Sequence, residues 1–145
     1  MRRKARECAL QLIYQLDMQG ILADGRVEPR EVDEPIRAFW ASFDAVTKDE
    51  QAFAERIVEG VLKQLPEIDE AIEAASKRWK LARMEQVDRS VLRMAAYELL
   101  WCKDVPRAAV INEAIEIARK FSNNDASSFI NGLLDQIAVE PEGAR

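Results

Sequence analysis

The sequence predicts an all-α protein, and three observations support this fold class. Helix-forming residues dominate the 145-residue chain, while Gly and Pro number only five each. Apolar residues recur at the three- and four-residue spacing of an amphipathic helix, in a pattern that gives about seven helices. No segment shows the sustained alternation of apolar and polar residues that is typical of a half-buried strand. The length fits one domain, so we expect residues 1–145 to fold as a single unit.

The first predicted helix ends before Gly20 and Gly25 and carries apolar residues on two opposite sides. One side has the spacing of a buried stripe: Ala5, Cys8, Ala9, Leu12, Ile13 and Leu16. The other side, about 180° away at about 100° per residue, consists of Arg3, Glu7, Leu10, Tyr14 and Met18. Such a helix is either enclosed within the fold or keeps one face for a partner.

Two helix starts are marked in the next part of the chain. Asp33 is expected to cap a short helix that has Pro35 in its first turn. Thr47 and Glu50 have the spacing of a capping box, in which each side chain accepts a hydrogen bond from the other residue's backbone. The apolar residues that these helices should bury are Ile36, Phe39, Trp40 and Phe43, then Phe53, Ala54, Ile57, Val58, Val61 and Leu62.

The rest of the chain predicts four more helices. Pro66 opens one, and the segment from Val87 to Trp101 is apolar nearly all round, as in the central helix of a bundle. Pro106 precedes another, and turn-forming residues at 122–125 precede the last. The core positions of the three amphipathic helices are Ile68, Ala71, Ile72 and Ala75; Val110, Ile111, Ala114, Ile117, Ala118 and Phe121; and Ala126, Phe129, Ile130, Leu133, Leu134 and Ile137.

The composition argues against most kinds of enzyme. The chain contains no histidine, which excludes imidazole as a general base or metal ligand. Cys8 and Cys102 stand in apolar stretches without paired spacing, so we expect reduced core residues and a cytoplasmic location. There is no glycine-rich phosphate loop, nucleophile elbow or apolar run of membrane length. We therefore expect neither catalysis nor a cofactor, metal site or membrane span.

The strongest candidate for a binding site is the basic start, which consists of Arg2, Arg3, Lys4 and Arg6. These cations could neutralise several phosphates, and Tyr14 further along the helix could stack on a base. The formal net charge of −5 argues against indiscriminate nucleic-acid binding, so any such contact must be local. Cations gain nothing from the dipole at a helix N-terminus, so a ligand would help to explain them. The alternative is a solvated terminus with no function.

A series of motifs follows in order along the chain: Arg3–Gln11 with Tyr14, Val87–Arg93 with Tyr97–Leu99, Asp104–Pro106, Val110–Glu116 and Phe129–Asp135. Together these motifs resemble the NusB family of transcription antitermination factors. The resemblance covers nearly the whole chain and is weak only between about residues 21 and 45.

This resemblance implies an all-α fold of two packed, three-helix-like bundles. It also implies that the chain binds the single-stranded boxA element of ribosomal RNA leader transcripts. In the family this binding occurs together with NusE, a small-subunit ribosomal protein, and supports read-through by the RNA polymerase antitermination complex.

The family's functional positions carry over to particular residues. The resemblance implies that the basic start contacts RNA, as do Tyr14, Arg89, Asp125 and Phe129. It places Leu10, Tyr14, Met18 and Asp88 on the partner surface. Some of these residues have structural alternatives: Phe129 lies on an apolar stripe and is as well suited to packing, and Asp125 and Asp88 are suited to helix caps. For Asn131 and Gly132 we expect a role in close helix packing.

The chain also departs from the family pattern. It ends with Glu140 and Glu142 rather than a basic segment, and Ser127 and Ser128 stand where many members have more basic or bulkier residues. We therefore expect weak RNA binding by the isolated chain. Two alternatives remain open: an adaptor that binds protein only, and the RNA-binding domain of a ribosomal RNA methyltransferase of which this chain is a fragment. A second copy of the chain is the alternative to NusE as the partner.

Overall fold

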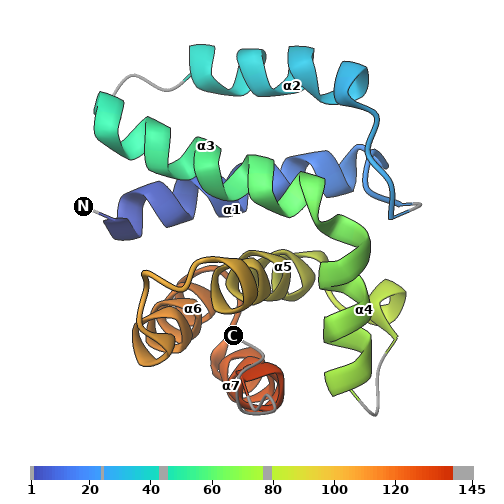
Figure 1. Cartoon of the computed structure of the whole chain (residues 1–145), viewed down its shortest axis with the longest axis vertical. Coiled ribbons are helices and arrows are strands. Elements are labelled where there is room, and N and C mark those ends of the chain that lie inside the picture. Colours follow the sequence, from blue (N-terminus) through green and yellow to red (C-terminus); the bar gives the residue numbers. More distant parts are fainter. Residues whose placement is uncertain (1, 24, 43–45, 77–79, 139–145) are drawn as a thin grey trace.

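The computed structural model describes residues 2–23, 25–42, 46–76 and 80–138. These residues form seven α-helices and one short 3-10 helix and confirm the all-α prediction (Figure 1). The elements are α1 (Arg2–Met18), α2 (Pro29–Ala41), α3 (Lys48–Lys63), α4 (Leu65–Ala75), η1 (Leu81–Arg83), α5 (Gln86–Trp101), α6 (Arg107–Phe121) and α7 (Asn124–Ala138). None of the helices in the described ranges is long and apolar enough to cross a membrane.

The helices fall into two groups around α5. In Figure 1, α1, α2 and α3 occupy one half of the molecule, and α4, α5, α6 and α7 occupy the other. Helix α5 packs against α1, α3, α4, α6 and α7, and this explains why the segment from Val87 to Trp101 is apolar nearly all round. Its residues Val91, Leu92 and Ala96 are fully buried. The two groups therefore share one hydrophobic core.

Helix α1 is enclosed by the fold along most of its length. Its predicted stripe is buried, with no member more than 3% exposed, and the helix packs against α2, α3 and α5. On the second side Leu10 is also buried, whereas Met18 is 52% exposed. Gly20 ends the helix with a φ of 80°, a left-handed conformation that glycine adopts without steric cost. The second side of α1 therefore keeps surface for a partner from Tyr14, which is half-buried, to Met18.

The capping prediction is confirmed for α3 and wrong for α2. Thr47 and Glu50 form the complete capping box. Helix α2 begins at Pro29 rather than at a cap by Asp33, because proline at the first helical position has the required φ and needs no hydrogen-bond acceptor. Pro35 consequently lies inside the helix.

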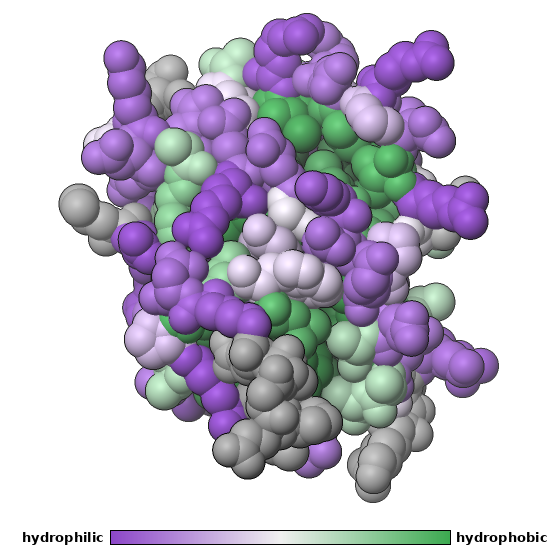
Figure 2. All heavy atoms as spheres, in the orientation of Figure 1, coloured by the Kyte–Doolittle hydropathy of each residue, from purple (hydrophilic) through white to green (hydrophobic). Residues whose placement is uncertain are grey.

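The apolar side of α2 faces the rest of the first group. Phe39 is buried, and Ile36 and Trp40 are half-buried, as predicted, while Phe43 lies outside the described residues. Figure 2 shows apolar surface in the half of the molecule that contains α2 and α3. Helix α2 packs against α1, and most of its residues outside the apolar side are exposed.

The close approach of a glycine occurs in α3 and not, as expected, in α7. A Cβ atom on Gly60 would overlap the ring of Tyr97 from α5, whereas nothing lies near a Cβ built on Gly132. Asn131 and Gly132 are both exposed, so the prediction that they serve close packing is wrong. Glycine fits at position 60 because the ring of Tyr97 occupies the space that a side chain there would need.

Both cysteines belong to the core, as predicted. Cys8 and Cys102 are buried and form no disulfide. Burial raises the pKa of both thiols, and it does so because an apolar environment disfavours the thiolate.

Candidate nucleic-acid interface

The basic start divides into an exposed part and a buried part. Arg2, Arg3 and Lys4 are exposed, but Arg6 is only 5% exposed. Arg2 lies over the ring of Phe53, 4.7 Å from its centroid. Arg3 donates two hydrogen bonds to the carboxylate of Glu113, at 3.0 and 2.7 Å. Nearly half of the Arg3 side chain remains exposed, so it can still reach a phosphate.

Arg6 instead forms a buried ion pair with Glu98 of α5. Its Nε and Nη2 atoms each donate to one carboxylate oxygen at 2.8 Å, and Glu98 is 2% exposed. The hydrogen bond from Arg6 to Glu98 is the main reason that the pKa of Arg6 is raised. A guanidinium held in this way is not accessible to RNA, so we leave Arg6 out of the candidate interface. The clue in the sequence was Glu98, a carboxylate in a buried helix that needs a cation.

Arg89 has a structural role of the same kind. Its Nε donates to Asp17 of α1 at 2.8 Å and its Nη1 to the carbonyl of Leu81 at 3.1 Å. Only 12% of the Arg89 side chain is exposed. One turn later, Arg93 makes a bidentate pair with Asp69 of α4 at 2.9 and 3.0 Å. These arginines fasten α1 and α4 to α5, and Arg89 therefore has little surface left for RNA.

A cavity of about 430 Å³ brings together three of the predicted site residues, Asp88, Asp125 and Phe129. Phe129 is half-buried, packs against the core on one side and lines the cavity on the other. Packing and ligand contact are therefore compatible for this ring. Arg83 also lines the cavity. The sequence holds an unused signal for this arginine, because it ends a basic run that consists of Lys77, Arg78, Lys80 and Arg83.

Neither aspartate in this cavity caps a helix, contrary to expectation. Helix α5 begins at Gln86, which places Asp88 inside its first turn. The cap of α7 is Asn123, whose Oδ1 accepts the backbone N–H of Ala126 at 2.7 Å. Asp125 is thereby left exposed at the edge of the cavity.

Asp88 has an unusual environment. Its Oδ1 is buried and has no hydrogen-bond partner among the described residues. Burial raises the pKa of Asp88, and a hydrogen bond from Ser122 opposes that rise. An unpaired carboxylate oxygen at a cavity wall can accept a hydrogen bond from a ligand or a partner.

A second cavity, of about 250 Å³, lies on the second side of α1 and is lined by Leu10, Gln11, Tyr14, Val87 and Phe121. Leu10 is buried and contributes only to the wall, whereas Tyr14 is half-buried. Val87 precedes Asp88, and Phe121 precedes Ser122, so the two cavities share the start of α5 and the end of α6. They lie next to each other.

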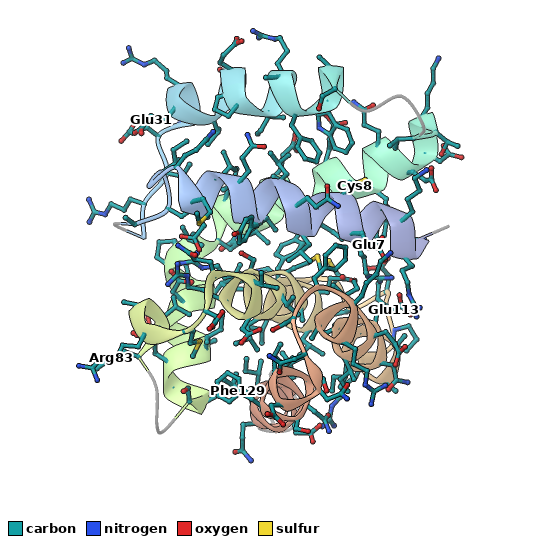
Figure 3. All side chains as sticks on the ribbon, turned by 180° about the vertical axis from the view of Figure 1, so that it is seen from behind. Glu7, Cys8, Glu31, Arg83, Glu113 and Phe129 are labelled. Atoms are coloured by element: carbon teal, nitrogen blue, oxygen red, sulfur yellow. The ribbon has the colours of Figure 1, made fainter. Side chains whose placement is uncertain are left out.

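The boundary between α1 and α6 connects these cavities with the basic start. Along it, Arg3 pairs with Glu113 and Lys120 donates to Glu7 at 3.1 Å. Tyr14 and Phe121 follow at the second cavity. We call this line of residues the α1–α6 seam: Arg3, Glu7, Tyr14, Glu113, Lys120 and Phe121. Figure 3, turned by 180° from Figure 1, labels two of these residues, Glu7 on α1 and Glu113 on α6, and also Phe129 on α7.

The seam has the dimensions of an extended ligand. Tyr14 follows Arg3 by eleven positions, and a helix of that length spans about 16 Å. Cations lie along it at Arg3 and Lys120, and Arg83 lies at its far end in the Phe129 cavity. No cluster of potential metal ligands occurs in the described ranges. The arrangement suits a chain of phosphates and bases more than it suits chemistry on a small substrate.

Comparison with known proteins gives three results. The model of the NusB family matches residues 3–139. The transcription antitermination protein NusB of Anaeromyxobacter dehalogenans is 44% identical over 137 residues, which cover 94% of this chain and 89% of that protein. The solved structure of T. maritima NusB has 32% identity and a TM-score of 0.79, and the match covers 95% of this chain and 90% of that one.

A further solved structure contains antitermination factors NusB and NusE in complex with double-stranded RNA. One of its chains matches this protein with 25% identity and a TM-score of 0.79, and the match covers 94% of this chain and 95% of that one.

Proposed function

Because this chain belongs to the NusB family, we propose that it is a non-catalytic, RNA-binding factor that acts in transcription antitermination. The RNA is the single-stranded boxA element of ribosomal RNA leader transcripts, and the partner is NusE. The chain acts as one unit over residues 1–145, in the cytoplasm, within the RNA polymerase antitermination complex. The related structure of NusB and NusE with double-stranded RNA supports a protein partner and an RNA ligand together, while the single strand and the boxA element rest on the family resemblance.

One observation carries the RNA part of the proposal: the α1–α6 seam joins the exposed arginines to the Phe129 cavity. Arg2 and Arg3 lie at one end, and Asp88, Asp125 and Phe129 lie at the other. The arginines bind phosphates, and Phe129 and Tyr14 offer ring faces to bases. Arg6 and Arg89 do not contact the RNA themselves. Their ion pairs hold α1 against α5 and so fix the position of the seam.

NusE occupies the end of the seam near Met18. Met18 is 52% exposed. Among the described residues, Met18 and Trp101 are the two large apolar side chains that are exposed to solvent. Tyr14 lies one turn before it, beside the second cavity. Exposed apolar surface next to a hollow is typical of a protein-binding site. We therefore assign Met18 to NusE contact, with Leu10 as the buried wall behind it, and Tyr14 to the border of the two ligands, where it can contact both RNA and NusE.

The proposal is tested by fluorescence anisotropy with labelled boxA RNA, in the presence and absence of NusE. We expect weak binding by the chain alone, because its net charge is −5, and tighter binding with NusE. Two control RNAs are a scrambled single strand and a boxA duplex. Equal affinity for boxA and scrambled RNA, or no boxA binding with NusE present, would contradict the proposal.

A second function has one specific observation in its favour. Arg3 and Lys120 already have carboxylate partners in Glu113 and Glu7, as expected for an adaptor that binds only protein. That adaptor would bind NusE with the same affinity whether or not RNA is present. The titration described above separates the two functions, since only the RNA-binding factor couples NusE and boxA binding.

A further inference from the structure

A pair of stacked aromatic rings lies at the end of α5, outside the seam. The rings of Tyr97 and Trp101 are 6.0 Å apart between centroids and within 15° of parallel. Tyr97 is held against α3, where the absence of a side chain on Gly60 makes room for it. Trp101 is 38% exposed, so Tyr97 fixes one face of the indole and part of the ring system remains open to solvent.

Helix α3 connects this aromatic pair to the exposed part of the basic start. Three of its residues, spaced by three and four positions, contact three different neighbours. Phe53 lies under Arg2, Arg56 pairs with Asp104 at 3.1 Å, and Gly60 lies against Tyr97. The distance along the helix from residue 53 to residue 60 is about 10 Å. Arg2 and Trp101 therefore belong to one continuous surface.

Electrostatics also places Arg2 close to this surface. The pKa of Asp104 is lowered, chiefly by its hydrogen bond from Arg56, and the charge of Arg2 contributes as well. Two cations thus converge on the loop that follows Trp101. The hollow between α3 and Tyr97 is lined by two carboxylates and two cations, Glu55, Glu59, Arg56 and Lys63, so the local charge is nearly balanced.

A nearly neutral surface with a fixed, open aromatic ring favours stacking over phosphate binding. Aromatic side chains bind unpaired bases through their faces, with little dependence on sequence, and the stacked ring itself neutralises no phosphate. Nearby arginines can hold the adjoining backbone without making the surface strongly cationic. The continuity with Arg2 favours RNA over a protein as the occupant, because RNA that reaches Arg2 has only to continue along α3.

We propose that Trp101, held in place by Tyr97, is a stacking platform for an unpaired base of RNA that extends past the basic start along α3. This inference rests on the proposed function and deepens it, since it adds a second stretch of RNA contact along α3, outside the seam. Arg56 lies between the platform and Arg2 and can hold the RNA backbone, and Phe53 carries Arg2 at the other end of this surface.

The first test compares a minimal boxA RNA with boxA RNAs extended by unpaired nucleotides at either end, with NusE present. For one of the extended RNAs we expect Trp101→Ala to weaken binding at least about fivefold, with the salt slope unchanged. The affinity for minimal boxA should not change. Trp101→Phe should retain most of the binding, because a phenyl ring still offers a face to the base. The unchanged affinity of Trp101→Ala for minimal boxA also shows that its weaker binding of the extended RNA is not due to misfolding.

The second test uses fluorescence. The chain has three tryptophans, so the double variant Trp40→Phe/Trp79→Phe leaves Trp101 as the only indole. An extended RNA that stacks on Trp101 should quench its emission, while minimal boxA should not.

The outcomes separate this inference from the proposed function. If the wild type binds boxA with NusE but Trp101→Ala binds every extended RNA equally well, the platform is refuted and the proposed function stands. If Trp101→Ala weakens NusE binding in the absence of RNA, the surface belongs to a protein and the platform is again refuted. If the wild type does not bind boxA at all, both proposals fail.

Discussion

Arg3 and Arg6 lie one turn apart on α1, and each binds both oxygens of a glutamate carboxylate. The Arg3 pair with Glu113 is open to water, since 48% of the Arg3 side chain is exposed, whereas only 6% of the Arg6 side chain is exposed. The geometry of the two pairs is nearly the same, but their consequences differ. Water screens the first pair, so its arginine can exchange a carboxylate for a phosphate. The second pair is buried, so Arg6 cannot leave Glu98 without leaving a charge unpaired in the core, and the pair has a structural role.

The largest effect should follow from breaking the buried pair. Arg6→Ala leaves Glu98 buried without a cation, and we expect the free energy of unfolding to fall by about 3–5 kcal/mol. Urea denaturation, monitored by circular dichroism, measures this decrease. Replacing both partners, as Arg6→Met/Glu98→Leu, should recover much of the stability because no charge is left unpaired. A stable Arg6→Ala protein that no longer binds RNA would reverse our assignment of Arg6.

The exposed arginines should show the opposite behaviour. Arg2→Ala/Arg3→Ala should reduce boxA affinity several-fold, because the variant can no longer neutralise two phosphates, and change the free energy of unfolding by less than about 1 kcal/mol. Anisotropy and urea denaturation measure the two quantities. Arg37→Ala is the matched control, since Arg37 is an exposed cation with an acidic partner, Glu34, on α2 away from the seam. If Arg37→Ala weakens binding as much, RNA is not bound locally at the basic start.

A smaller gain in binding should follow from releasing Arg3. Arg3 lowers the pKa of Glu113 through their hydrogen bond, so the pair contributes at neutral pH and is lost as the pH falls through that depressed pKa. Glu113→Gln removes the competing carboxylate at neutral pH, and we expect boxA affinity to rise about two- to fivefold. A lower affinity would show that Glu113 positions Arg3 for RNA rather than competing with it.

The smallest effect concerns Asp88. Burial raises its folded-state pKa above the ordinary value, so its favourable contribution is present below the unfolded pKa and is lost as the pH rises through the folded pKa. Asp88→Asn abolishes this titration and should raise the free energy of unfolding at neutral pH by less than about 1 kcal/mol, after allowance for solvent screening. Urea denaturation at several pH values checks this. An unchanged pH dependence would show that another group is responsible.

Periodicity predicted the helices well because burial along a helix repeats with the turn. The stripe from Ala5 to Leu16 and the central position of α5 were both evident from spacing alone. The capping box at Thr47 was equally local. The start of α2 was misplaced because Asp33 and Pro29 are both acceptable signals, and only the proline is used.

The candidate site was harder to predict, because it depends on contacts between distant parts of the chain. Nothing near Arg6 distinguishes it from Arg3, and the difference arises from Glu98, which lies 92 positions away in the sequence. The error in the cap of α7 was local. Asn123 and Asp125 are both suited to capping, and the structure uses Asn123 instead of the predicted Asp125. Gly60 gave no periodic signal, since its role depends on the ring of Tyr97.

The salt dependence of boxA binding, measured with NusE present, is the most direct test of RNA binding at the exposed arginines. We compare the wild type with Arg2→Ala/Arg3→Ala and Arg37→Ala, and plot the logarithm of the binding constant against the logarithm of the salt concentration. The slope should become shallower by about one for each phosphate that the double variant no longer neutralises, and it should stay unchanged in Arg37→Ala. Three equal slopes would contradict the assignment of RNA to the exposed part of the basic start.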